Sequence, residues 1–168
     1  MKTYIKKFLF SIFLIGGICW VTVDMASAQR DGLGVGIVVG DPTGLSLKKF
    51  LSGNGALQAG MTWSRSGTNL GIPISGSSTS FFYLQLDYIY HVYLTSGRTG
   101  LQIPFYIGLG GFNIFRESPI GGLRLPLGLA LHLGSLPLDI FFEVTPGVAV
   151  YPEAQTYTGL ALGARFYF

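Results

Sequence analysis

The chain has few charged residues and a single cysteine. Asp, Glu, Lys and Arg make up 11% of its 168 residues, against about 25% in typical soluble domains, whereas hydrophobic residues reach 49%. Because so few charges cannot cover a surface that faces water, we expect part of the protein to face an apolar environment. The single cysteine, Cys19, excludes disulfides within the chain and cysteine-based metal sites.

The start of the chain has the pattern of a secretory signal peptide. A positively charged beginning precedes an apolar stretch at residues 8–23, and Ala26 and Ala28 supply the small residues that signal peptidase accepts. A retained membrane anchor is the alternative, but the apolar stretch is short for a complete span. We therefore expect a signal peptide at residues 1–28 and a mature chain at residues 29–168.

Removal of this segment would take away the cysteine and most of the net charge. The remaining chain carries eight basic and seven acidic residues. This balance gives no reason to expect nucleic-acid binding. A lipoprotein anchor is not expected either, because Ile18, directly before Cys19, is not the small residue that such a signal requires.

The mature chain has no run of about 18 apolar residues, the length that a transmembrane helix requires. Instead, apolar and polar residues alternate in blocks of about ten, which is the pattern of membrane-spanning strands. The sequence therefore predicts an all-β fold, an eight-stranded antiparallel up-and-down transmembrane β-barrel. The predicted strands occupy residues 33–40, 45–50, 57–64, 82–92, 101–110, 123–133, 138–145 and 160–168.

Turn residues and one long polar stretch separate the predicted strands. Residues 41–44 and 52–55 are rich in the residue types that favour tight turns, and the longest connection runs from Arg65 to Thr79. With a periplasmic N-terminus, most of the longer connections lie on the outer side, as in outer-membrane barrels. The remaining connections are predicted at residues 95–100, 113–119, 134–137 and 151–158.

Three prolines interrupt the alternation. Pro104, Pro126 and Pro146 lie within predicted strands, and a proline nitrogen cannot donate to the hydrogen-bond ladder of a sheet. We therefore expect bulges or breaks in the ladder at these three positions.

Composition predicts which face of the strands points inward. One face is mostly glycine, alanine, serine and glutamine, with one or two charges per strand, and it suits the narrow lumen of a barrel of about eight strands. The other face is leucine, isoleucine and phenylalanine, and it suits hydrocarbon. A soluble barrel is the alternative, but this composition would leave very large apolar patches exposed to water.

The charged residues of the predicted inner face are balanced in sign. Such residues either fill the lumen by pairing with one another or line a narrow path for small solutes, and a selective pore usually carries charge of one sign. The balance therefore favours filling. The candidate site is this lumenal charge network of Lys48, Asp87, Arg124, His132, Asp139, Glu143 and Arg165.

His132 and Asp139 also allow an enzymatic interpretation. A turn at residues 134–137 would place them opposite each other on the same face, with Ser135 nearby. These residue types suggest a hydrolase, but a triad requires a nucleophile that faces the substrate in a defined geometry. We favour an ion pair inside the lumen, and the sequence predicts no catalytic, cofactor-binding or metal-binding residues.

Aromatic residues near the ends of the blocks are expected to form girdles at the two lipid interfaces. The glycines of residues 32–40 do not match the Gly-x-Gly-x-x-Gly pattern that opens a helix, so no nucleotide site is predicted. The predicted girdle residues, all near block ends except the central Tyr88, are Trp63, Tyr88, Tyr90, Tyr93, Tyr151, Tyr157, Phe166 and Phe168.

Several stretches resemble a known family. The chain ends in Phe166-Tyr167-Phe168, and this terminal alternation resembles the signal that the bacterial barrel-assembly machinery recognises. The stretches GLGVG at 32–36, GDPTGLSLK at 40–48, PFYIGLGG at 104–111, LRLPLGL at 123–129 and PLDIFFEV at 137–144 resemble a widespread, poorly characterised family of small bacterial outer-membrane β-barrels. The architecture resembles the transmembrane domains of OmpA, OmpX and OmpW. The resemblance implies a fold and a bacterial outer-membrane location, and it carries over no catalytic residue.

Together these observations predict an envelope protein that is not an enzyme. Its expected role is structural or interactive, and its expected partners are outer-membrane lipid, the barrel-assembly machinery and an external partner at the loop from Arg65 to Thr79. A narrow passive channel for small solutes is the first alternative. A lipid-modifying enzyme is the second, and the predicted outer connections disfavour it because they contain no histidine.

Overall fold

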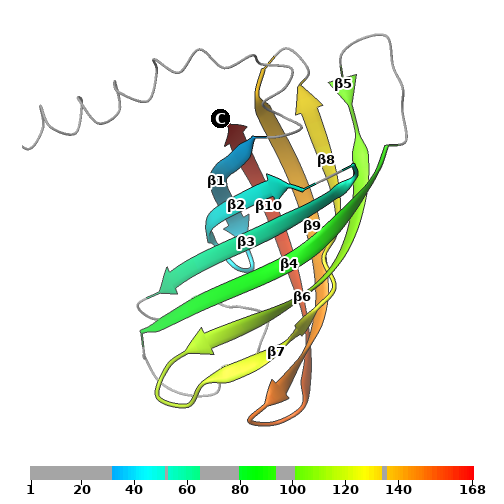
Figure 1. Ribbon diagram of the computed structural model, residues 1–168. Coiled ribbons are helices and arrows are strands. Elements are labelled where there is room, and N and C mark those ends of the chain that lie inside the picture. The colour runs from blue at the N-terminus through cyan, green and yellow to red at the C-terminus, as the bar shows by residue number, and fades with distance from the viewer. Residues whose placement is uncertain (1–31, 52, 65–79, 94–100, 134–135) are drawn as a thin grey trace, which may run out of the picture.

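A computed structural model describes residues 32–51, 53–64, 80–93, 101–133 and 136–168 (Figure 1). The predicted signal peptide at residues 1–28 and the predicted outer loop from Arg65 to Thr79 lie outside the described residues. In the part of the chain that is described, no helix is long and apolar enough to cross a membrane.

The described strands form one antiparallel sheet that closes into a barrel. When β5 with β6 and β7 with β8 are each counted as one strand, strands that follow one another in the chain pair, and β10 pairs with both β9 and β1, so that the hydrogen-bonded sheet forms a ring of eight strands. The prediction of an eight-stranded antiparallel barrel is confirmed. The strands in the described residues are β1 (Leu33–Gly40), β2 (Gly44–Phe50), β3 (Gly55–Ser64), β4 (Phe81–Tyr93), β5 (Leu101–Gln102), β6 (Pro104–Phe115), β7 (Ile120–Arg124), β8 (Leu127–Leu133), β9 (Leu138–Tyr151) and β10 (Gln155–Tyr167).

Two strands of the ring are each divided into two pieces. β7 and β8 both pair with β6 on one side and with β9 on the other, so they occupy one position in the ring. β5 continues β6 in the same register against β8, with an interruption at Ile103. The breaks predicted at Pro104 and Pro126 are therefore confirmed.

Missing proline donors explain the interruption between β7 and β8. The amide of Gly108 donates to the carbonyl of Pro126 at 2.8 Å, and the amide of Leu125 donates to the carbonyl of Pro146 at 2.9 Å. In an antiparallel pair the second hydrogen bond would come from the facing residue, and in both pairs that residue is a proline. The break predicted at Pro146 is present only on the side of β7 and β8, where no pair lies between Arg124–Gly147 and Leu127–Val144, while β9 itself continues and stays paired with β10.

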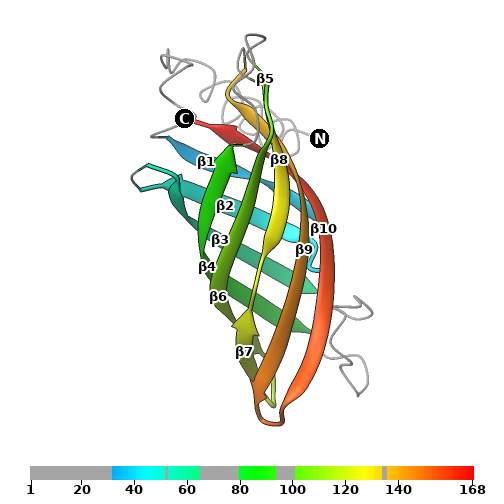
Figure 2. The same ribbon diagram turned by 90° about the vertical axis from the view of Figure 1, so that its right-hand side faces the viewer.

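The strands extend further toward the end of the barrel that holds the β9–β10 turn than the sequence predicted. β6 reaches Phe115, β9 reaches Tyr151 and β10 begins at Gln155, so the predicted connections at residues 113–119 and 151–158 are too long. Backbone pairing continues there although the apolar alternation stops, since a ladder bonds through main-chain groups. Figure 2 shows the long β9 and β10 beside the much shorter β1 and β2.

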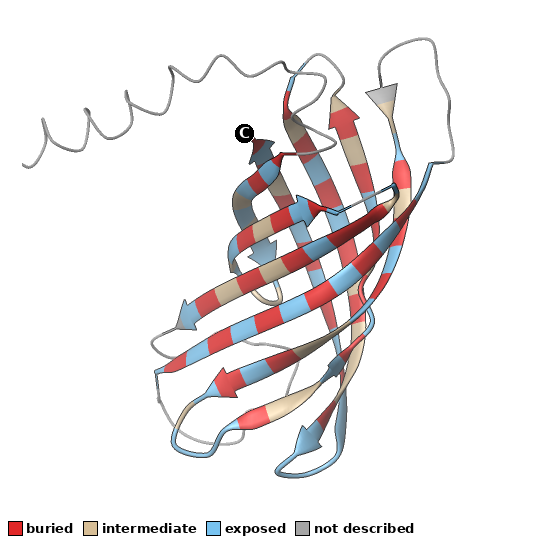
Figure 3. Ribbon diagram, in the orientation of Figure 1, coloured by how far each residue is buried: buried red, intermediate tan, exposed pale blue. Residues whose placement is uncertain are grey.

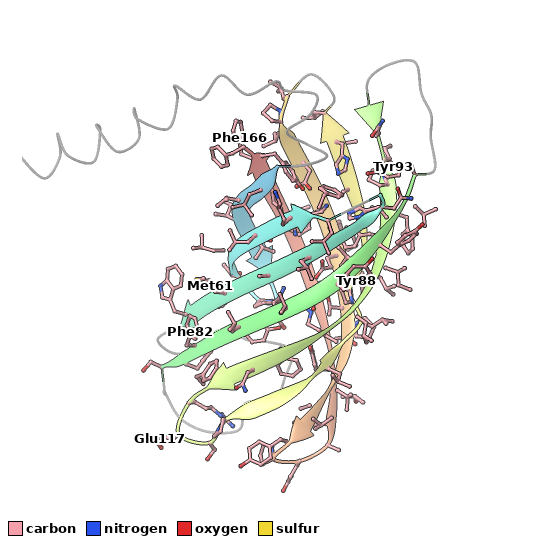
Figure 4. The ribbon with its side chains drawn as sticks, viewed as in Figure 1. Met61, Phe82, Tyr88, Tyr93, Glu117 and Phe166 are labelled. Carbon is pink, nitrogen blue, oxygen red and sulfur yellow. The ribbon has the colours of Figure 1, made fainter. Side chains whose placement is uncertain are left out.

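Burial alternates along the long strands, and the outward residues are mostly apolar, whereas the buried charged side chains all lie on the inner face (Figure 3). In β4, for example, Asp87 is 1% exposed, whereas Leu86 is 58% exposed. Figure 4 shows Phe82 and Tyr88 on the outer side of the same strand. This polarity is the reverse of a soluble barrel, whose interior would hold the apolar face.

Candidate functional site: the lumenal charge network

Three layers fill the interior of the barrel. Along β4 the inward residues run from Phe81 and Tyr83, through Gln85 and Asp87, to Ile89, so polar side chains lie between two apolar groups. One apolar cluster contains Phe81, Tyr83, Phe112, Ile114, Ile120, Ala149 and Tyr157. The other contains Phe50, Ala56, Ile89, Tyr106, Ala130, Phe141 and Tyr167.

Arg124 is the centre of the first charge cluster. Its Nη2 lies 2.7 Å from Oε1 of Glu143 and its Nε lies 3.1 Å from Oδ1 of Asp87. Its Nη1 also donates to the hydroxyl of Tyr83 at 2.9 Å and to Oε1 of Gln85. One guanidinium therefore holds two carboxylates whose side chains are almost completely excluded from water.

Glu143 is bonded through both of its carboxylate oxygens. Oε2 accepts hydrogen bonds from Nε2 of Gln58 at 2.8 Å and from the hydroxyl of Tyr106 at 2.9 Å. Oε1 accepts from Arg124 at 2.7 Å and from the hydroxyl of Thr145 at 3.0 Å. A buried carboxylate with this many donors carries little of the cost of an unpaired charge.

Asp139 is the centre of a second cluster nearer the C-terminal end of β10. Its Oδ2 accepts a hydrogen bond from the hydroxyl of Tyr167 at 2.7 Å. The same oxygen lies 3.5 Å from Nζ of Lys48, 3.6 Å from Nη1 of Arg165 and 3.9 Å from Nε2 of His132. His132 faces Asp139 in the β8–β9 ladder, as the turn between them predicted.

Gln58 connects the two clusters. Its Nε2 donates to Glu143, and its Oε1 accepts from Nη2 of Arg165 at 2.7 Å. Arg165 also donates from Nε to the hydroxyl of Ser46 at 2.9 Å, and its guanidinium carbon lies 3.7 Å from the centroid of the Phe141 ring. The clusters therefore form one network across the interior.

Little space remains around the network. A pocket lined by Pro42, Leu45, Thr62, Gln58 and Arg165, among other residues, has room for about one water molecule. Among the described residues, no group of three or more His, Cys, Asp or Glu side chains could hold a metal ion. The arrangement can neutralise charge and fill the interior.

The structure places all seven residues of the predicted network inside the barrel and brings them together around Arg124 and Asp139. Ser135, the third member of the hydrolase alternative, lies outside the described residues. Sequence reasoning missed the bridging roles of Ser46, Gln58 and Thr145. For two of them the alternation of side chains along a strand was an available signal, because Ser46 lies two positions from Lys48 on β2 and Thr145 lies two positions from Glu143 on β9. β3 carries no charged residue, so Gln58 had no such reference on its own strand.

All but one of the predicted girdle residues lie on the outer face of the described barrel, and their position at the lipid interfaces stays a prediction. Trp63 is 66% exposed and Tyr151 is 58% exposed, whereas Tyr157 is only 9% exposed and belongs to an interior cluster. The placement of Tyr157 in the girdle is wrong because β10 begins before Tyr157. Side chains alternate along a strand, so Tyr157, eight positions from the inward Arg165, also points inward. Phe166 and Phe168 lie on the outer side, with ring centroids 5.1 Å apart.

Register and burial together define the class of the protein. It is a closed antiparallel β-barrel of eight strands with an apolar exterior and an interior in which a charged network lies between two apolar clusters. No family model matches the sequence, and no curated protein matches it. Among solved structures, Ail, the attachment invasion locus protein of Yersinia pestis, is similar to this chain, with 12% sequence identity, a TM-score of 0.38 and coverage of 82% of this chain and 94% of that chain.

Proposed function

We propose that the chain is a bacterial outer-membrane barrel with a structural or surface-interaction role in the cell envelope, exported with residues 1–28 removed. The observation that carries this proposal is the reversed polarity of the barrel. Leu109, Leu160 and Leu162 are among the residues exposed by more than half on its outer face, whereas the charged side chains of the network lie inside. A closed barrel satisfies its backbone within the wall, as a chain in hydrocarbon must.

The filled interior favours a scaffold over a porin. The network from Arg124 to Asp139 occupies the level at which solutes would have to pass, and aromatic clusters lie on both sides of it. An eight-stranded barrel is only wide enough for its own side chains. The proposed role therefore uses the outer surface and the connections of the barrel, with no catalytic site or cofactor.

Two measurements test this proposal. The mature protein should begin at Gln29, fractionate with the outer membrane and migrate on gels as a heat-modifiable species. Recovery of unprocessed chain, or of protein in the soluble periplasm, would contradict the location.

The second measurement is single-channel recording of the refolded protein in planar bilayers. We expect no large, steady conductance, because the charge network and the two apolar clusters fill the described part of the interior with side chains. Porin-sized steady openings would overturn the filled-lumen proposal and favour the alternative of a channel for small solutes.

A further inference from the structure

The wall of the barrel has a step beside β10. β10 pairs with β1 only up to the pair of Ala161 and Gly40, and β2 pairs with β3 only up to Leu45 and Met61. On the opposite edge, β10 continues against β9 as far as Gln155. Figures 1 and 2 show the β1–β2 hairpin ending part-way along β10. We call this step the seam.

The seam lies at the depth of the outer leaflet in the proposed orientation. A transmembrane strand needs about 9–11 residues to cross the hydrocarbon, whereas β1 has 8 residues and β2 has 7. β9 and β10, with 14 and 13 residues, are long enough. On the side of β1 and β2, the wall therefore ends before the hydrocarbon does.

Thr158 presents main-chain groups to the seam. The amide of Asp41 donates to the carbonyl of Leu160 at 2.7 Å, so Leu160 directs its main-chain groups toward β1. Alternate residues of a strand direct these groups to the same side, so Thr158 and Thr156 do the same, beyond the end of β1. No hydrogen bond to the amide or carbonyl of Thr158 on that side is present among the described residues.

The polarity of the outer face changes at the same level. Leu160 and Leu162 are 54% and 58% exposed on β10, and the next outward residues are the exposed Thr158 and Thr156. Across the seam, Trp63 on β3 is 66% exposed, and tryptophan favours the boundary between hydrocarbon and headgroups. Thr158 therefore lies at the boundary where lipid esters lie.

We propose that the seam binds one outer-leaflet acyl lipid, whose ester carbonyl accepts a hydrogen bond from the amide of Thr158. The acyl chain lies along the apolar wall formed by Val39, Leu45 and Leu160. This inference rests on the proposed membrane location. In hydrocarbon an unpaired main-chain donor costs free energy, and an ester carbonyl at the boundary removes this cost.

A polypeptide strand fits the seam less well than a lipid. On β10, Thr156 and Thr158 are the described residues that present groups to it, because the pairing of Asp41 with Leu160 closes one end and β10 begins at Gln155. A partner strand or a second copy of the chain would find about two residues to pair with, fewer than the 3–10 residues of ordinary strands. A lipid needs only one donor.

Solid-state NMR tests the contact directly. The ¹⁵N-labelled mature protein is reconstituted in vesicles of phosphatidylcholine that carries ¹³C at its ester carbonyls, and in a second sample in vesicles that contain ¹³C-labelled lipopolysaccharide. We expect a through-space contact between the lipid ester and the Thr158 amide, and the two samples show which lipid supplies it. Acyl-chain contacts at Leu86 without any ester contact at Thr158 would overturn the proposal but leave the membrane location intact. Absence of lipid contacts at Leu86 would overturn the location itself.

Two variants distinguish the contribution of the Thr158 amide to lipid binding from that of its side chain. Thr158→Pro removes the amide that faces the seam but leaves the β9 ladder intact, whereas Thr158→Val keeps the amide. Native mass spectrometry of barrels released from the same vesicles should show one fewer retained lipid for T158P and no change for T158V. Equal lipid retention in folded wild type and T158P would contradict the proposal. A contact between Thr158 and a ¹³C-labelled second copy in a mixed sample would overturn it in favour of chain pairing.

Discussion

Arg124 donates from Nη2 to Oε1 of Glu143 across 2.7 Å, inside a barrel whose outer surface is apolar. The same guanidinium holds Asp87 at 3.1 Å, so one cation neutralises two carboxylates. Removal of the cation and removal of a carboxylate should therefore lower the stability of the barrel by different amounts, which unfolding experiments can measure.

Loss of Glu143 should destabilise the barrel. Glu143→Ala removes acceptors for Arg124, Gln58 and Tyr106 together, and we expect the free energy of unfolding to fall by about 3–5 kcal/mol, the usual cost of breaking a buried pair. Urea titration of the folded protein in lipid vesicles measures the change. Glu117→Ala, in the exposed connection between β6 and β7, is the control and should have little effect. A Glu143→Ala barrel as stable as wild type would show that the pairing contributes nothing.

Loss of Arg124 should cost more than neutralisation of Glu143. Arg124→Met leaves the carboxylates of Asp87 and Glu143 buried together without a cation, whereas Glu143→Gln keeps most of the hydrogen bonds and leaves Arg124 paired with Asp87. We therefore expect a lower unfolding midpoint for R124M than for E143Q. The combined variant with Met at 124, Asn at 87 and Gln at 143 should recover much of the loss, and the opposite order of midpoints would contradict this account.

An arginine on the outer face should report contact with hydrocarbon. Leu129 is 45% exposed and lies in the middle of the ladder between β6 and β9. Leu129→Arg should lower the free energy of unfolding in vesicles by about 2–4 kcal/mol, and Phe115→Arg, at the outer end of β6, by about 0–1 kcal/mol. Equal effects at the two positions would contradict the proposed orientation in the membrane.

Gly128 should tolerate no larger side chain, for a reason unrelated to lipid. A Cβ at this position would overlap the ring of Tyr106, and the Tyr106 hydroxyl donates to Glu143 at 2.9 Å. Gly128→Leu should therefore displace Tyr106 and lower the unfolding midpoint. Gly121→Ala is the matched control, because the nearest atoms to a Cβ there are 3.8 Å away. Equal midpoints for the two variants would remove this explanation.

The terminal phenylalanine should matter for assembly more than for the finished barrel. Phe168 donates from its amide to the carbonyl of Leu33 at 3.2 Å and packs its ring against Phe166, so its contribution to the folded wall is small. Deletion of Phe168 should lower the heat-modifiable fraction in cells but change little after refolding in detergent. A normal fraction in cells would argue against its role as an assembly signal.

Strand parity made much of the inner face predictable from the sequence. Because side chains alternate strictly along a strand, Lys48, Asp87 and Arg165 could be placed inside without any contact information. Parity failed only where a strand boundary was wrong, as at Tyr157, since the apolar alternation ends before the ladder of β10 does. Proline chemistry predicted the breaks near Pro104 and Pro126 but overestimated the effect of Pro146.

The sequence by itself determined the reversed polarity, since the scarcity of charge and the leucine-rich outer face need no tertiary information. Only the tertiary structure decided which charges meet. Arg124 could pair with several carboxylates by composition, and it reaches both Glu143 and Asp87 because the closed ring brings β4 and β9 to the same level across the interior. The seam at Thr158 also depends on the closure of the ring. The short β1–β2 hairpin leaves a step only because ring closure places β1 beside the longer β10.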